Sequence, residues 1–167
     1  MVLVDTSVWS LALRRRPKDL SREQQLVVRE WSELVREGRV QMIGPVRQEL
    51  LSGLRHKQQF ALLEQRLAAF SDTPIETADY VEAARLFNLL RDRGITGAPT
   101  DLLICAVARR REWAIFALDE DFERYARVVP MRLHRVAPAR QQPPPGITDS
   151  ASRTGTRTLP GGSRLRR

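Results

Sequence analysis

The chain has 167 residues, a formal net charge of +8 and a composition that is 42% hydrophobic but only 6% aromatic. This length suits one globular domain with an aliphatic core, and the composition excludes a chain that is disordered throughout. The positive charge predicts a polyanionic partner, because basic surfaces concentrate phosphates. From residue 137 onward, six arginines against one acid give +5, which leaves +3 of the total for residues 1–136. The expected folded part is therefore only mildly basic.

The sequence also predicts a compartment. The single cysteine, Cys105, lies in an apolar run and has no partner for an internal disulfide, which favours a reducing cytoplasm. The first residues show no basic and apolar leader, and no window approaches the roughly 18 apolar residues of a membrane span. We expect a cytoplasmic protein without a membrane partner.

In chain order, short apolar runs alternate with helical stripes. The runs predict strands at residues 2–4, 40–43, 73–76, 114–118 and 131–136. The first clear helix follows Ser21, which forms a capping-box pattern with Gln24, and Gly38 ends it. Further helices are predicted over residues 45–53, 56–70, 78–93 and around 102–108. In the helix at 78–93, the spacing predicts an inner face made of Val81, Ala84, Phe87 and Leu90.

This alternation predicts an α/β fold. Residues 1–136 are expected to form a three-layer α/β/α domain with a short central parallel sheet flanked by helices. Residues 137–167 are rich in Pro, Gly, Ser and Arg and predict a basic disordered tail, because they offer too little apolar surface to offset the entropy of ordering.

Four acids stand at corresponding places in this pattern. Asp5 and Asp119 end apolar strands, Glu49 lies on a helix that follows another strand, and Asp101 lies in the first turn of a buried helix. The carboxyl ends of parallel strands share one edge of a sheet, so we expect the four carboxylates to converge there. Crowded carboxylates are costly without a cation, and oxygen ligands favour Mg²⁺, with Mn²⁺ as a substitute.

Each acid also has a simpler interpretation when taken alone. Asp5 suits a helix N-cap, Asp101 suits the positive end of a helix dipole, and Glu49 suits a solvated helix face. Asp121 suits the acidic first turn of a following helix as well as a metal site. Only the ordered set favours metal binding.

Four segments together resemble a known family. They are residues 2–7 (VLVDTS), 45–50 (PVRQEL), 100–106 (TDLLICA) and 117–122 (ALDEDF). In order and separation they look like the four motifs of PIN-domain nucleases, in particular the VapC-type toxins of bacterial toxin–antitoxin pairs, over roughly residues 1–135. The resemblance implies that the catalytic, metal-binding acids are Asp5, Glu49, Asp101 and Asp119. It adds Asp121 as a further ligand or a neighbour of the metal, and Thr6 or Ser7 as groups that orient a carboxylate or a water.

The resemblance also implies a reaction and partners. A metal-activated water would cleave RNA, such as transfer or ribosomal RNA, to 5′-phosphate and 3′-hydroxyl ends. A small antitoxin protein would cover the acidic cleft. A two-fold homodimer is expected, with its contact on the helices near Trp31 or Phe60.

One residue departs from the family pattern. Ala117 stands where family members commonly carry Thr or Ser, two residues before the fourth acid. This departure favours one alternative, a PIN-like scaffold that binds RNA or protein without cutting. Other classes are excluded by their motifs, because the first strand is followed by Asp5-Thr6-Ser7 and not by the Gly-rich turn of a dinucleotide-binding domain.

Overall fold

The computed structural model describes residues 1–136, and the predicted tail lies outside the described residues. Its centre is a five-stranded sheet in the order β3-β2-β1-β4-β5, in which every neighbouring pair is parallel. The strands are β1 (Val2–Val4), β2 (Val40–Ile43), β3 (Asp72–Thr73), β4 (Ala114–Phe116) and β5 (Arg132–Leu133). The predicted parallel sheet is confirmed, with the last three strands shorter than the sequence indicates.

Seven α-helices flank this sheet in the described part of the chain. They are α1 (Thr6–Arg14), α2 (Arg22–Arg36), α3 (Gly44–Leu51), α4 (Lys57–Leu67), α5 (Thr77–Arg91), α6 (Pro99–Arg110) and α7 (Asp121–Ala126). The capping box of Ser21 and Gln24 is present at the start of α2. Gly38, which ends α2, has a φ of 65°, a conformation that glycine adopts without steric cost.

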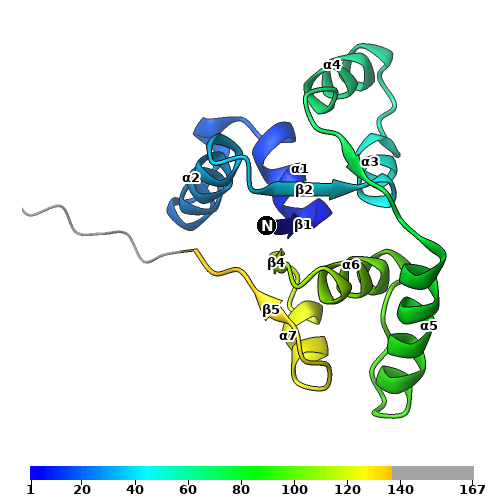
Figure 1. The fold of residues 1–167 in the computed structure, drawn as a ribbon. Coiled ribbons are helices and arrows are strands. Elements are labelled where there is room, and N and C mark those ends of the chain that lie inside the picture. Colours follow the sequence, from blue (N-terminus) through cyan, green and yellow to red (C-terminus); the bar gives the residue numbers. More distant parts are fainter. Residues whose placement is uncertain (137–167) are drawn as a thin grey trace, which may run out of the picture.

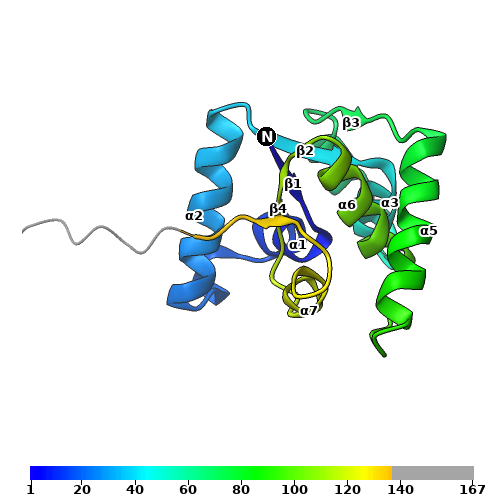
Figure 2. The same cartoon turned by 60° about the horizontal axis from the view of Figure 1, so that its bottom comes forward.

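The topology places helices on both faces of the sheet. The chain runs from β1 outward to β2 and β3, then returns past β1 to β4 and β5. Figure 1 shows the helices arranged around the strands, and Figure 2 shows α2 on one side of the strands with α5 and α6 on the other. The order in which strands are added to the sheet therefore reverses between β1 and β4, and ligands bind at such a point in open α/β sheets.

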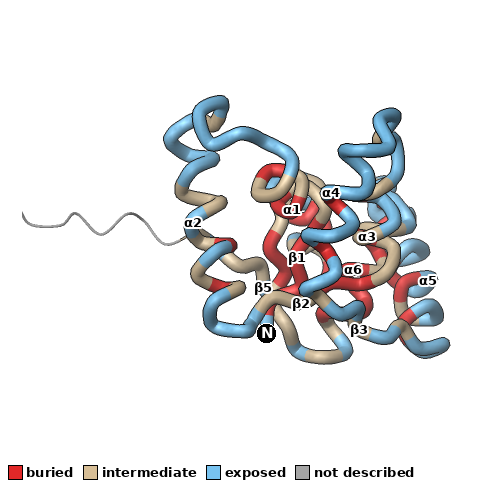
Figure 3. The backbone as a smooth tube through the Cα atoms, turned by 90° about the horizontal axis from the view of Figure 1, so that it is seen from above, coloured by how far each residue is buried: buried red, intermediate tan, exposed pale blue. Residues whose placement is uncertain are grey.

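The core lies around the central strand. All three residues of β1 are fully buried, as expected for a parallel strand that is covered on both faces. Figure 3 shows that buried residues concentrate in β1, α1 and α6, whereas α2 and α4 are largely exposed. Within the described residues, no helix combines the length and the apolar character that crossing a membrane requires.

The inner face of α5 differs from the sequence prediction. Val81 and Phe87 are 45% and 40% exposed, and only Leu90 of the predicted face is buried. The face that packs inward is made of Asp79, Ala83, Leu86 and Leu90. Asp79 is fully buried because Arg110 and Arg111, at the end of α6, hold its carboxylate at 2.7 and 2.9 Å. A charge at the core boundary is unfavourable unless it is paired, so the apolar pattern alone selected the wrong side.

Trp31 lies on the buried face of α2. Its ring packs edge-on against Trp9 at 5.3 Å and is tilted against Phe70 at 6.2 Å, and its exposed fraction is 9%. Trp31 therefore belongs to an internal aromatic cluster, and a dimer contact near it would use other residues of α2. Phe60 remains 38% exposed on α4.

Candidate metal-binding site

The four predicted acids lie around the carboxyl ends of the central strands. Asp5 directly follows β1, and its backbone N–H donates to the carbonyl of Phe116 at the end of β4, at 2.9 Å. Glu49 lies on α3, which begins immediately after β2. Asp119 follows β4 after two intervening residues, and Asp101 lies in the first turn of α6. Because β1 pairs with both β2 and β4, these positions share one edge of the sheet.

The pKa of Asp101 responds to the charges of the other three acids. The pKa of Asp101 is raised to about 6, first by burial and then by the negative charges of Asp5, Asp119 and Glu49. A hydrogen bond from Tyr125 opposes this increase in the pKa. Like charges raise the pKa of a carboxyl group because they disfavour its ionised form. The sequence prediction that Asp5, Glu49, Asp101 and Asp119 would converge is consistent with this coupling.

Neutral donors hold each of these carboxylates. Oδ2 of Asp5 accepts from the amide of Ser7 at 2.9 Å and from its hydroxyl at 2.5 Å. The carboxylates of the other acids each accept one hydrogen bond: Glu49 from Thr6 Oγ1 at 3.2 Å, Asp101 from the Tyr125 hydroxyl at 3.3 Å, and Asp119 from the backbone N–H of Asp121 at 2.9 Å. Among residues 1–136, none of the four is in an ion pair. The site therefore carries negative charge that the described side chains do not neutralise.

The four acids differ in how far they are exposed to solvent. Asp5 is 6% exposed and Asp101 is partly buried, whereas Glu49 and Asp119 are exposed. Asp5 is also the N-cap of α1, and Asp101 is the acid in the first turn of α6, so both simpler interpretations hold as local structure. They do not compete with a shared site, because a capping carboxylate uses only part of its acceptor capacity.

Asp121 differs from the four. Its carboxylate pairs with Arg124 at 3.0 Å, one turn along α7, and its side chain is 37% exposed. A local cation already offsets its charge. Its described contribution to the site is the backbone N–H that donates to Asp119.

The residues present match Mg²⁺ in chemistry. All four groups are carboxylates, the oxygen ligands that this cation prefers, and their uncompensated charge favours a divalent cation. Within residues 1–136, however, no three His, Cys, Asp or Glu side chains already converge into a metal-holding cluster. The donor set therefore fits the cation, while the side chains do not form a ready-made coordination cage.

The sequence missed two connections in this site. Leu118 donates its N–H to Oγ of Ser7 at 3.0 Å, so a hydroxyl from the first motif contacts the residue that follows Ala117. Tyr125 reaches Asp101 from α7, across 24 positions of sequence. Helical spacing places Tyr125 on the same side of α7 as Phe122 and Asp121, but no sequence signal indicates which acid it contacts.

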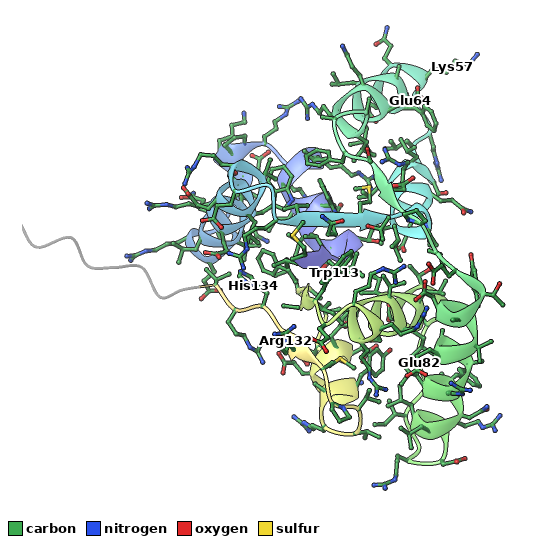
Figure 4. All side chains as sticks on the ribbon, viewed as in Figure 1. Lys57, Glu64, Glu82, Trp113, Arg132 and His134 are labelled. Carbon is green, nitrogen blue, oxygen red and sulfur yellow. The ribbon has the colours of Figure 1, made fainter. Side chains whose placement is uncertain are left out.

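His134 stands apart from this site. Nε2 of His134 lies 2.8 Å from Oε1 of Glu30, so this contact joins the segment after β5 to α2. Figure 4 labels His134 in this segment. Glu82, on α5, instead pairs with Arg109 of α6 at 3.0 Å (Figure 4). Both contacts tie helices or strands together at the periphery.

A parallel α/β sheet with four carboxylates around the carboxyl ends of its central strands places this chain among the open α/β proteins that carry their sites at the strand ends. The family model described as the PIN domain matches residues 2–128. The chain belongs to the PIN domain family. A comparison with curated proteins gives no match.

Several solved structures share this fold. The crystal structure of FitAcB from Neisseria gonorrhoeae is similar with a TM-score of 0.61 and 23% identity, covering 77% of this chain and 95% of that chain. VapBC2 from Rickettsia felis, bound to a DNA fragment from their promoter, has a TM-score of 0.64 and 16% identity, covering 80% and 98%. DNA-bound VapBC from Salmonella typhimurium has a TM-score of 0.60 and 16% identity, covering 80% and 96%. At these identities the likeness establishes the fold.

Proposed function

We propose that this protein is a Mg²⁺-dependent endoribonuclease and the toxin of a toxin–antitoxin pair. The observation that carries the proposal is the set of four interacting carboxylates, from Asp5, Glu49, Asp101 and Asp119, that no described cation neutralises. Membership of the PIN domain family and the likeness to VapBC and FitAcB support the same assignment.

The roles of the residues follow from their positions. Asp5 and Asp101, the more buried acids, would hold Mg²⁺, and Glu49 and Asp119 would complete its oxygen ligands from the exposed side. When bound, the cation would activate a water and offset charge on the scissile phosphate. Ser7, Thr6 and Tyr125 orient the carboxylates through their hydroxyls. No histidine base is needed for this chemistry.

An antitoxin partner belongs to the same proposal. The similar structures are of two-component assemblies, as the names VapBC and FitAcB state. A partner segment that brings a basic side chain to the four acids would neutralise them in place of the metal and so block activity. We propose that a small protein encoded next to this chain plays this part.

A homodimer is also proposed, with a contact face that differs from the one the sequence indicates. Val81 and Phe87 are exposed on the outer face of α5, about 1.7 turns apart, with Ala84 between them. An apolar stripe on a helix face is suited to a two-fold contact, because the same surface serves both subunits.

The nuclease proposal is tested on the purified full-length chain. RNA is incubated with Mg²⁺, with Mn²⁺ and with a chelator, and the product ends are mapped by sequencing. We expect metal-dependent cleavage to 5′-phosphate and 3′-hydroxyl ends, lost in D5N and D101N. The matched control is D92N, since Asp92 is an exposed acid at the end of α5. RNA binding without metal-dependent cleavage would instead identify the non-cutting scaffold that Ala117 favours.

The toxin proposal has its own test. Induced expression of the wild-type chain should arrest growth, and D5N should not. Co-expression of the product of the adjacent short gene should restore growth and copurify with the chain. A harmless wild-type chain that still cleaves RNA in vitro would remove the toxin assignment and leave the nuclease assignment intact.

A further inference from the structure

Tyr125 is a buried polar side chain whose hydroxyl points to the acidic site. It has no exposed surface, and its ring packs edge-on against Phe122 at 5.8 Å. Its hydroxyl donates to Oδ2 of Asp101 at 3.3 Å, at the long end for a contact between a hydroxyl and a carboxylate. A buried tyrosine hydroxyl needs a polar partner, and Asp101 supplies it.

This contact joins two parts of the site that are carried by different helices. Asp101 lies at the start of α6, and Tyr125 lies on α7, which follows the segment that carries Asp119. Among residues 1–136, Tyr125 provides the one hydrogen bond to the carboxylate of Asp101. The donors to Asp5 and Asp119 are within two residues of their acceptors, so their hydrogen bonds are local. Tyr125 is thus the donor that ties Asp101 to the segment that carries Asp119.

Tyr125 reaches this carboxylate as a neutral hydroxyl donor. The contact therefore orients Asp101 without cancelling its charge.

We propose that Tyr125 is a positioning residue for the metal-binding site: its hydroxyl holds Oδ2 of Asp101 and so fixes the orientation of a carboxylate that would bind the divalent cation. The proposal rests on the proposed function, because it assigns Tyr125 a role toward the metal that the four acids would hold. Partners of this kind commonly change metal affinity by about 10–100-fold when they are removed.

The experiment compares Y125F with Y80F in the full-length chain. The chain contains two tyrosines, and Tyr80 is 53% exposed on α5, so Y80F is a matched loss of one hydroxyl. The midpoint of the metal-induced rise in melting temperature is measured by titration with Mg²⁺ and Mn²⁺. We expect Y125F to need about tenfold more metal than wild type, and Y80F to need the same amount.

Kinetics distinguishes positioning from a loss of folding. In Y125F, kcat at fixed submillimolar Mg²⁺ should fall about tenfold with KM for RNA unchanged, and excess Mg²⁺ should recover much of the loss. A Y125F protein with the wild-type metal midpoint and the wild-type kcat overturns the role of Tyr125 alone. A wild-type chain without any metal-induced shift overturns this role together with the proposed metal-dependent function.

A second measurement does not depend on the folding of Y125F. In the Y80F chain, Tyr125 is the single tyrosine, so labelling with ¹³C-ζ tyrosine gives one NMR signal that reports on its hydroxyl. We expect this signal to shift on addition of Mg²⁺ with the same midpoint as the melting temperature. A signal that stays unchanged while the melting temperature rises shows that Asp101 and Tyr125 do not sense the cation, and overturns the proposal.

Discussion

The hydroxyl of Ser7 donates a 2.5 Å hydrogen bond to Oδ2 of Asp5, and the backbone N–H of Ser7 donates to the same oxygen at 2.9 Å. The same hydroxyl accepts from the amide of Leu118 at 3.0 Å. One side chain therefore orients the most buried acid of the site and ties the end of β1 to the segment between β4 and Asp119.

Replacing Ser7 with alanine should affect both stability and activity. S7A removes the donor to Asp5 and leaves the amide of Leu118 without its partner, so we expect a loss of about 1 kcal/mol in the free energy of unfolding. Cleavage should fall about tenfold or more through weaker metal binding. The control is S32A, since the hydroxyl of Ser32 bonds only within α2, to Val28 at 2.8 Å. Equal effects of S7A and S32A on metal affinity would contradict this role.

Neutralising Asp101 should stabilise the metal-free protein in a pH-dependent way. The pKa of Asp101 is raised from 3.8 to about 6, so between these values the folded state holds a proton that the unfolded state loses. The stability of the wild type should therefore fall as pH rises from about 4 to 6, and stay lower above that window. D101N lacks this loss, and we expect it to gain about 1–2 kcal/mol relative to wild type between pH 4 and pH 7, after allowance for solvent screening.

Urea unfolding in the presence of a chelator measures the effect of D101N at both pH values, with D92N as the control. Cleavage by D101N should be lost at every pH. A difference in stability between D101N and wild type that is the same at pH 4 and pH 7 would show that Asp101 is not destabilised by its acidic neighbours.

The buried carboxylate of Asp79 should be a major source of stability. Burial alone would raise its pKa, but hydrogen bonds from Arg111, the backbone of Glu76 and Arg110 together lower it. Its contribution is therefore present above its unfolded pKa and is lost as pH falls through the lower folded value. We expect D79A to lose about 3–5 kcal/mol in urea unfolding, because the two arginines lose their shared partner.

The single variant R111A should cost less than D79A, since Arg110 still pairs with Asp79 at 2.7 Å. Metal-dependent cleavage at low temperature should survive in R111A, because this ion pair lies at the end of α6 opposite Asp101. A loss in D79A no larger than in the exposed control D92A would show that the ion pairs contribute little.

The outer face of α5 should mediate the proposed dimer. Phe87 is 40% exposed on this face, and a charge placed there by F87E should give a monomer at concentrations where the wild type sediments as a dimer. F60E is the matched comparison, since Phe60 is 38% exposed on α4. If F60E were monomeric and F87E dimeric, the interface would lie on α4 and not on α5. A wild type that is monomeric at high micromolar concentration would contradict the proposed dimer.

The sequence by itself determined the order of strands and helices and the places of the four acids. These features depend on short stretches of sequence. For example, the continuous apolar run before Asp5 predicts a strand that is buried on both faces of a parallel sheet, as β1 is. The same holds for the capping box at Ser21, which lies within four residues of its partner.

Only the tertiary structure decided how these elements face one another. The face of α5 that packs inward depends on Asp79, whose burial is stable because two arginines from α6 reach it. The hydroxyl that holds Asp101 comes from Tyr125, on another helix. A periodic pattern records which residues prefer burial, but the pairing of polar groups depends on distances between elements that are remote in the sequence, and these distances are set when the chain closes around its sheet.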